Sequence, residues 1–249
     1  MNDCLIIIPT YNELENVEAL QCSIFENYSE TDILFVDDNS PDGTGNLLDE
    51  LRGRDSRIHV LHHESKTGLG RAYIAGFKWA LNRHYQFILQ MDADFSHDPS
   101  DIPRLLDAAQ TADLVLGSRY VDGIRVINWP LSRLFLSKTS GAYVRLITGL
   151  PVSDPTGGFK CFRRSVLESI DLDSIRSVGY SFLVEVTFNA WMLGFRIVDV
   201  PITFEERRSG KSKMSTSIIR EATWIVWKLG MLSGFRRRPG ERHPRSVAG

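Results

Sequence analysis

The stretch Cys4-Leu5-Ile6-Ile7-Ile8-Pro9 is apolar at every position rather than at every second one. A strand of this kind is buried on both faces, as in parallel sheets that helices cover on both sides. Similar runs follow at Ile33–Val36, Ile58–Leu61, Phe87–Met91 and Leu114–Leu116. Stretches with helical spacing lie between them, at Glu15–Phe25, Thr44–Leu51, Leu69–Leu81 and Asp101–Ala109. This alternation predicts an α/β domain with a mainly parallel central sheet and helices on both faces.

Length and charge narrow the class of protein. The chain has 249 residues, of which 43% are hydrophobic and 24% charged, and this suits one large α/β domain with a short appendage. A formal net charge of -2 argues against nucleic-acid binding. The basic end of the chain indicates either a solvated tail or a contact with anionic lipid. Its arginines are Arg236, Arg237, Arg238, Arg242 and Arg245.

Cysteine usage and the length of apolar runs predict the compartment. The 3 cysteines have no metal-like spacing, and an odd count favours a reducing environment. Leu5–Ile8 is too short for the core of a secretion leader. Ile218–Phe235 is interrupted by charged residues, so we expect no transmembrane helix. We therefore expect a cytoplasmic protein that associates peripherally with the cytoplasmic face of a membrane.

Polar clusters follow the first two apolar runs directly, at the strand ends where such sheets bind ligands. Pro9-Thr10-Tyr11-Asn12-Glu13 lacks the glycine-rich turn of a dinucleotide-binding fold. Tyr11 is placed to flank a base, and Glu13 to bond a base edge or a ribose hydroxyl; the alternative is a helix cap at Asn12. Val36-Asp37-Asp38 suits ribose hydroxyls or a base donor, unless it only starts a turn.

Two further clusters carry the chemistry of charged ligands. Asp92-Ala93-Asp94 follows the fourth run, and its two carboxylates can reach one hard cation such as Mg²⁺ or Mn²⁺, which would neutralise a leaving diphosphate. Alone, the same pattern also fits a solvated turn. Arg119 follows the fifth run and is suited to clamp a phosphate. The basic loop from Arg207 to Lys213 indicates a phosphate-closing lid or a solvated loop.

Together with the turn Asp154-Pro155-Thr156-Gly157-Gly158-Phe159, these motifs occur in an order that resembles the family-2 glycosyltransferases, and among them the dolichol- or polyprenyl-phosphate mannose synthases. The resemblance runs from about Leu5 to Ser215. It implies a GT-A catalytic domain over residues 1–215, followed by a C-terminal amphipathic helix and basic tail over 216–249. It also implies a GDP-mannose donor, Mg²⁺ or Mn²⁺, and an inverted anomeric product.

The resemblance also implies a set of site residues. The nucleotide sugar would contact Pro9, Tyr11, Glu13, Val36, Asp38, Asp92, Ala93, Asp94, Arg119, Arg207 and Lys213. Asp92 and Asp94 would bind the metal, and the catalytic residues would be Asp94, Arg119, Arg207 and Lys213. Some relatives have glutamine two residues after the second aspartate. This chain has Ser96 and then His97, so the third metal ligand stays open between Ser96, His97 and water.

The implied acceptor, a dolichyl or undecaprenyl-type phosphate, is already an anion near neutral pH. We therefore expect positioning and charge stabilisation to matter more than proton removal. Arg119, with Arg125 or Arg133, is expected to hold the acceptor phosphate. Asp154 is the best-placed base by sequence, with a structural role in its turn as the alternative.

Two segments are expected to meet the membrane surface. Ile127–Lys138 and Trp224–Leu229 each combine apolar residues and tryptophan with nearby cations, although each also fits a core helix. The expected partners are GDP-mannose, a polyprenyl phosphate and a membrane surface, with no nucleic acid; a membrane-anchoring subunit stays open.

Other functions fit parts of the same pattern. A UDP-sugar such as UDP-glucose would use the same fold and metal, because Tyr11, Glu13 and Asp38 do not distinguish guanine from uracil. A nucleotide-sugar-binding scaffold without turnover is disfavoured by the intact Asp92 and Asp94. A dehydrogenase is disfavoured by the missing glycine-rich turn.

Overall fold

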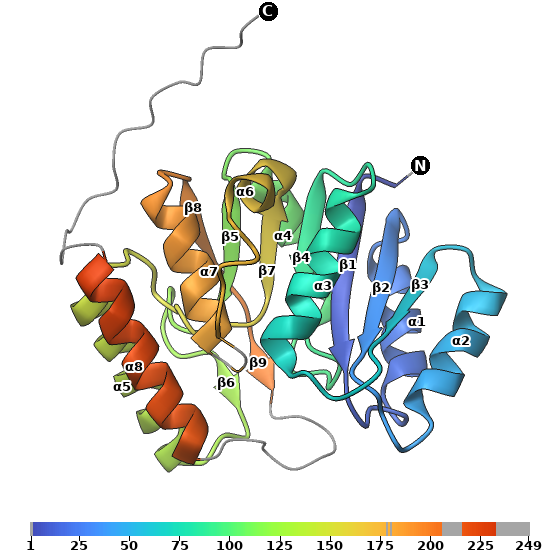
Figure 1. Ribbon diagram of the computed structural model, residues 1–249, viewed down its shortest axis with the longest axis horizontal. Helices are drawn as coiled ribbons and strands as arrows, with labels where there is room; N and C mark the ends of the chain where they lie inside the picture. The colour runs from blue at the N-terminus through green and yellow to red at the C-terminus, as the bar shows by residue number, and fades with distance from the viewer. Residues whose placement is uncertain (1, 178, 180, 206–215, 233–249) are drawn as a thin grey trace, which may run out of the picture.

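The computed structural model describes residues 2–177, 179, 181–205 and 216–232, and a seven-stranded sheet lies at its centre (Figure 1). The strand order is β3-β2-β1-β4-β7-β5-β8, and only β7 runs antiparallel to its neighbours in this sheet. The strands are β1 (Cys4–Thr10), β2 (Thr31–Asp37), β3 (Ile58–His62), β4 (Phe87–Gln90), β5 (Leu114–Ser118), β7 (Lys160–Arg163) and β8 (Ile197–Pro201). The predicted fold class, a mainly parallel sheet, is confirmed.

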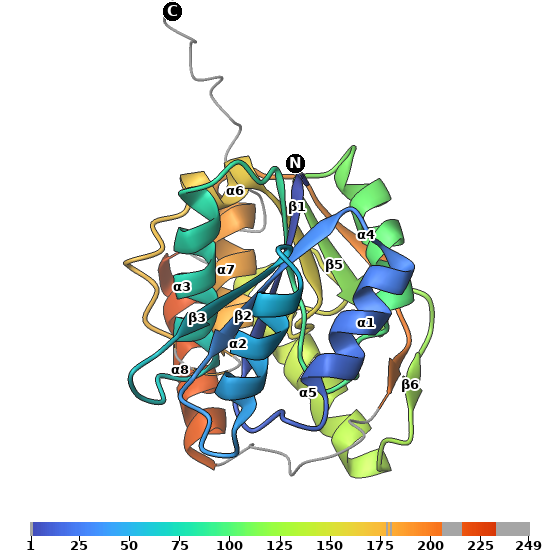
Figure 2. The same ribbon diagram turned by 90° about the vertical axis from the view of Figure 1, so that its right-hand side faces the viewer.

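Helices cover both faces of this sheet (Figure 2). One face packs on α3 (Leu69–Leu81), α6 (Arg164–Ser169) and α7 (Ser181–Met192). The other packs on α1 (Val17–Asn27), α2 (Thr44–Arg54) and α4 (Ile102–Ala109), the last preceded by a short 3₁₀ turn at Pro99–Asp101. Helices α1 to α4 overlap the four stretches that the sequence predicts, and their boundaries differ by a few residues at most.

Strand β1 shows why every position of a central strand is apolar. Leu5 and Ile7 are buried under α3, whereas Ile6 and Ile8 are buried on the opposite face, among residues of α1. Alternate side chains point to opposite faces of a strand, so a strand covered on both sides needs an apolar residue at each position. Gly76 lets α3 approach β1 closely, because a Cβ there would lie 2.6 Å from Ile7 Cγ2.

A second, two-stranded sheet pairs β6 (Val126–Ile127) with β9 (Phe204–Glu205) in parallel. The sequence from Ile197 to Phe204 predicts a single strand, and this prediction is wrong, because β8 and β9 are separate strands in different sheets. Strand β8 ends at Pro201, the Ile202 N–H donates to the Ser118 carbonyl, and the chain then leaves the main sheet. Phe204 pairs with Val126 and also forms an isolated bridge with His97.

Helices α5 (Leu131–Thr148) and α8 (Thr216–Leu232) lie side by side beyond β8 (Figure 1). Val226 and Leu229 of α8 are buried in the same core as α3 and α7, so this helix packs on the main domain. In the described part of the chain no helix is both long and apolar enough to span a membrane. The domain boundary at residue 215 stays a prediction, because residues 206–215 lie outside the described part.

Candidate active site

The loops after β1 and β2 are bonded to each other at the carboxyl edge of the sheet. The Asn12 N–H donates to Ser40 Oγ at 3.0 Å, and the Glu13 N–H donates to Thr44 Oγ1 at 3.0 Å. Thr10 Oγ1 donates to the Asp37 carboxylate at 3.1 Å. The structure thus brings the first two predicted clusters together. The alternative that Asn12 caps a helix is wrong, since α1 begins at Val17 after an N-cap at Asn16.

Asp38 holds the loop that leads into α3. Its Oδ1 accepts hydrogen bonds from the Thr67 N–H at 2.7 Å and the Thr67 hydroxyl at 2.8 Å and lies 2.9 Å from His63 Nδ1, while its Oδ2 accepts from the Gly68 N–H at 2.7 Å. Burial alone would raise the pKa of Asp38, but these bonds outweigh burial and hold the pKa below its ordinary value. Asp38 is therefore ionised at neutral pH and fixes the position of the loop.

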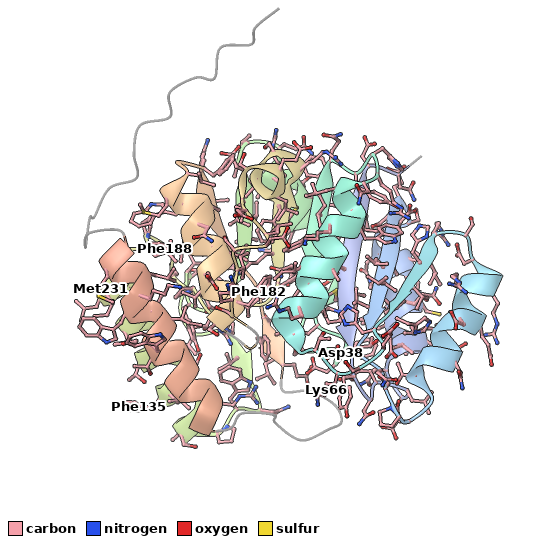
Figure 3. All side chains as sticks on the ribbon, in the orientation of Figure 1. Asp38, Lys66, Phe135, Phe182, Phe188 and Met231 are labelled. Atoms are coloured by element: carbon pink, nitrogen blue, oxygen red, sulfur yellow. The ribbon has the colours of Figure 1, made fainter. Side chains whose placement is uncertain are left out.

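This loop places a cation over a predicted base-binding residue. Lys66 Nζ lies 3.5 Å from the centre of the Tyr11 ring, a cation–π distance. Figure 3 shows Asp38 and Lys66 at the same edge of the sheet. Lys66, His63 and Thr67 could not be predicted as part of this region, because nothing in the sequence of the loop after β3 indicates that it folds over the end of β1.

Two residues predicted to contact the nucleotide have buried side chains. Val36 and Ala93 both belong to the hydrophobic core, and Pro9 stands opposite Val36 in the β1–β2 register. The structure therefore does not expose either side chain to a ligand, and their predicted contacts with the nucleotide stay predictions.

Asp92 and Asp94 lie in the loop that follows β4. Asp92 Oδ1 accepts a hydrogen bond from the Tyr73 hydroxyl at 3.4 Å, and the Asp92 side chain keeps 30% of its surface exposed. Asp94 Oδ1 accepts from the Ser96 N–H at 3.1 Å. Between them and His97, Phe95 has a positive φ of 61°, which turns the chain sharply.

The donor atoms of this loop fit Mg²⁺ or Mn²⁺. Such ions are commonly held by one or two carboxylates together with substrate phosphates and water, rather than by a closed protein cage. The described residues contain no group of three His, Cys, Asp or Glu side chains that could hold a metal. Ser96 Oγ, however, is buried without a hydrogen-bond partner in the described part, so one hydroxyl oxygen of the same loop has no bond of its own.

Arg119 and Asp154 form a buried ion pair. Arg119 Nε donates to Asp154 Oδ2 at 2.6 Å, and Arg119 Nη2 donates to Asp154 Oδ1 at 2.7 Å and to Thr156 Oγ1 at 3.0 Å. Burial alone would raise the pKa of Asp154, but the charge of Arg119 and the hydrogen bonds from Arg119 and Thr156 together outweigh burial and hold the pKa below its ordinary value. With Nε and Nη2 engaged, Nη1 is the nitrogen through which Arg119 can reach a phosphate.

The ion pair decides between the two expectations for Asp154. The carboxylate is 1% exposed and accepts four hydrogen bonds, from the Arg119 backbone and side chain and from Thr156. A general base must reach the proton that it removes. The structural interpretation therefore fits Asp154, and its partner is Arg119 rather than only the turn.

Aromatic rings surround the Arg119 guanidinium. Its Cζ lies 5.4 Å from the ring centres of Tyr120 and Trp129 and 5.3 Å from that of Phe204. The Arg133 Cζ lies 4.2 Å from the Trp129 ring, so this indole contacts both arginines. Arg125 instead pairs with Asp122 at 2.8 Å. Of the three arginines predicted to hold the acceptor phosphate, Arg119 and Arg133 share a neighbour and Arg125 is engaged elsewhere.

The remaining predicted site residues, Arg207 and Lys213, lie outside the described part of the chain, as does the arginine tail. The roles assigned to the other site residues stay predictions. In the structure Pro9 and Val36 lie near the carboxyl ends of β1 and β2, Arg133 lies in α5, and the other described site residues lie in the segments that follow strands.

The two segments expected at a membrane are only partly exposed. Leu131 and Phe135 of α5 are 82% and 72% exposed, and Trp224 of α8 is 67% exposed. Val226 and Leu229 are buried, so the core-helix alternative is correct for this face of α8. Further exposed apolar side chains on the two helices are Leu136, Leu146, Trp227 and Met231.

The mainly parallel α/β sheet, with paired carboxylates after the central strand β4, is the GT-A fold of glycosyltransferases, as the comparisons with known proteins show. The model of "Glycosyl transferase family 2" matches residues 5–171. The chain belongs to glycosyltransferase family 2.

Two curated relatives match almost the whole chain. The undecaprenyl-phosphate mannosyltransferase of Micrococcus luteus is 48% identical over 239 residues, covering 95% of this chain and 98% of that protein. The polyprenol monophosphomannose synthase of Mycolicibacterium smegmatis is 50% identical over 238 residues, covering 95% of this chain and 90% of that protein.

A solved structure shares the fold. The mannosyltransferase of Pyrobaculum calidifontis in complex with GDP-Man and Mn²⁺ aligns with a TM-score of 0.58 at 17% identity. The alignment covers 97% of this chain and 66% of that one. At this identity the similarity concerns the fold alone.

Proposed function

We propose that this protein transfers mannose from GDP-mannose to a polyprenyl phosphate, with inversion and with Mg²⁺ or Mn²⁺ held by Asp92 and Asp94. The observation that carries the proposal is the pair of carboxylates after β4, in a chain 48% and 50% identical to two enzymes named for mannose transfer to such lipids. The solved mannosyltransferase that shares the fold was captured with GDP-Man and Mn²⁺, so this fold can accommodate such a donor and metal.

The donor side is assembled from the first three loops. Tyr11 and Glu13 follow the end of β1 and would contact the nucleoside. Asp38 fixes the adjoining loop between β3 and α3. Asp92 and Asp94, with Ser96 Oγ as a third oxygen, would hold the cation. When bound, that cation would neutralise charge on the departing diphosphate.

The acceptor side would be built around Trp129. Arg119 and Arg133 contact this ring, and both carry charge that suits a lipid phosphate. The Asp154–Arg119 pair keeps the guanidinium in a fixed orientation, with Nη1 left to face the acceptor. A phosphate anion needs no proton removed before it attacks, which agrees with the burial of Asp154.

The face formed by α5 and α8 would lie on the cytoplasmic surface of a membrane. Exposed apolar side chains gather on these two helices, and Phe135 and Met231 lie at the end of the molecule away from β3 (Figure 3). Burying one such side chain in an apolar medium contributes about 1.5–3 kcal/mol. Several together would hold the protein at the surface where its lipid acceptor is embedded.

The decisive test is a transfer assay with purified protein, GDP-mannose and a polyprenyl phosphate, with and without a chelator. We expect a lipid-linked β-mannosyl product that disappears on chelation and returns with Mn²⁺ or Mg²⁺. UDP-glucose in parallel reactions tests the alternative donor. Turnover of UDP-glucose but not of GDP-mannose would contradict the proposal.

Vesicle flotation tests the membrane face. The double substitution Leu131→Ser with Phe135→Ser should weaken binding to anionic vesicles at least tenfold while leaving transfer to a short-chain, soluble acceptor intact. Leu193→Ser is a matched control, since Leu193 is 45% exposed but lies just after α7, outside α5 and α8. Equal binding by all variants would contradict this placement.

A further inference from the structure

His97 lies in the same loop as Asp92 and Asp94, and the proposed function gives it no role. It follows Asp94 by three residues, and only 1% of its surface is exposed. A buried polar ring needs partners for its nitrogens, and the identity of those partners decides what the ring can do.

The hydrogen bonds of His97 fix its tautomer. The Asp92 backbone N–H donates to His97 Nδ1 at 3.1 Å. A nitrogen that accepts a hydrogen bond carries no proton, so the proton of the neutral ring is on Nε2. His97 Nε2 faces Asp92 Oδ2 at 4.0 Å. One ring thus contacts the backbone and faces the carboxylate of the same residue.

This arrangement is incompatible with a role for His97 as the third metal ligand. A histidine ligand offers a lone pair on one of its nitrogens. Here the Nδ1 lone pair is used by the Asp92 N–H, and Nε2 carries the proton. The choice left open by the sequence therefore moves to Ser96 Oγ or water.

Packing holds the ring in one orientation. His97 stacks on Phe159, with ring centres 5.0 Å apart and planes at 19°, and meets the edge of Phe204 at 5.5 Å. Gly158 allows this close packing, because a Cβ there would lie 3.3 Å from both Asp92 Oδ2 and His97 Cε1. Phe204 also contacts Trp129, the ring beside Arg119, at 5.3 Å.

We propose that His97 is a positioning residue, which orients the Asp92 carboxylate for the cation without binding the cation itself. His97 Nδ1 fixes the Asp92 backbone through its hydrogen bond with the N–H. The Asp92 carboxylate is bonded by the Tyr73 hydroxyl on Oδ1, and His97 Nε2 faces Oδ2 at 4.0 Å, beyond hydrogen-bond distance. Groups that orient a metal ligand in this way typically change metal affinity about 10–100-fold when they are removed. The inference rests on the proposed metal site at Asp92 and Asp94.

Binding of Mn²⁺ in the presence of GDP, followed by electron paramagnetic resonance of free Mn²⁺, tests the inference without turnover. His97→Phe keeps a ring between Phe159 and Phe204 but removes both nitrogens, and we expect its dissociation constant for Mn²⁺ to rise about 10–100-fold. His97→Asn keeps an acceptor for the Asp92 N–H and should recover part of this loss. Thermal unfolding monitors the fold, because a purely structural role would lower the melting temperature without changing the affinity of the folded protein.

The outcomes separate this role from the proposed function. Wild-type affinity in His97→Phe, with binding lost in Asp92→Asn, would overturn the positioning role and leave the metal site standing. Loss of Mn²⁺ binding in both His97 variants to the extent seen in Asp92→Asn would make His97 a ligand and would also overturn it. Absence of Mn²⁺ binding in the wild type would overturn the metal site and this role together.

The tautomer offers a second readout in the metal-free protein. Nitrogen chemical shifts of ¹⁵N-labelled histidine distinguish an accepting Nδ1 from a protonated one. We expect His97 to carry its proton on Nε2 both before and after addition of Mg²⁺ and GDP. A proton on Nδ1, or a loss of the Nε2 proton on metal addition, would overturn the assignment.

Discussion

Replacing Asp154 by asparagine should destabilise the fold far more than it changes the chemistry. Asp154 accepts hydrogen bonds from the Arg119 N–H at 3.2 Å, from Nε at 2.6 Å and from Nη2 at 2.7 Å. Asparagine keeps the size of the side chain but leaves the Arg119 charge buried and uncompensated. Breaking one side of a buried pair in this way costs about 3–5 kcal/mol in the free energy of unfolding.

Urea unfolding at pH 7 measures this loss, and two variants serve as controls. Asp122→Asn removes the partner of Arg125 from an exposed pair, and it should change the free energy of unfolding by at most about 1 kcal/mol. Adding Arg119→Met to Asp154→Asn should recover much of the loss, because no unpaired charge then remains buried. A loss below about 1 kcal/mol in Asp154→Asn, together with abolished turnover, would refute this reasoning and make Asp154 a base.

The difference in the free energy of unfolding between wild type and Asp154→Asn should depend on pH, and the direction follows from the pKa of Asp154. The folded-state pKa of Asp154 is held below its ordinary value, so its contribution to stability is complete above the unfolded-state pKa of about 4. It is lost as the pH falls through the folded-state pKa. The difference between wild type and Asp154→Asn should therefore be constant near neutrality and shrink below about pH 4.

Two further predictions concern other buried charges. Asp38→Asn should weaken GDP binding about tenfold, because a neutral amide replaces the anion that accepts from the Thr67 and Gly68 N–H groups. Calorimetry measures this affinity, and an unchanged value would show that this loop is not part of the nucleotide site. Burial lowers the pKa of Lys160 to about 7, so above that pH the folded protein binds fewer protons at this side chain than the unfolded chain does. The free energy of unfolding of the wild type should therefore rise with pH above about 7, relative to that of Lys160→Met, in parallel urea titrations. A difference between these two proteins that does not depend on pH would contradict the assignment.

Most of the sheet could be predicted because its signals are local. Apolar runs and helical spacing are set by neighbours a few residues apart, and they located β1 to β5 and α1 to α4. The segment from Leu131 to Thr148 gave no clear helical stripe, because α5 carries exposed apolar side chains such as Leu131, Phe135 and Leu146 in addition to its buried ones. Periodicity fails where both faces of a helix are apolar.

Pairings between distant segments could not be predicted. Strand β7 inserts antiparallel between β4 and β5, and β9 pairs with β6 rather than continuing β8. Only Pro201, which lacks an N–H donor, marks the end of β8 in the sequence. These pairings join residues between 44 and 78 positions apart, which no local pattern encodes.

The positions of the candidate carboxylates could be predicted, whereas the side chains that hold them could not. The rule that ligands bind at the carboxyl ends of strands predicts Asp38 after β2 and Asp92 and Asp94 after β4, and the structure has them there, while their binding roles stay predictions. The partner of Arg119 was missed because Asp154 is 35 positions away and its turn motif suggested a different role. The sequence leaves His97 open as a metal ligand. In the structure its Nδ1 instead accepts a hydrogen bond from the N–H of Asp92, which is the proposed metal ligand.

The rate of mannose transfer by the double variant Asp92→Asn with Asp94→Asn, at saturating GDP-mannose, polyprenyl phosphate and Mn²⁺, tests the central claim most directly. The cation that these side chains hold is expected to contribute several kcal/mol to transition-state stabilisation, so the rate should fall on the order of 1,000-fold in a protein that still folds. A double variant that transfers mannose within tenfold of the wild-type rate would contradict the account.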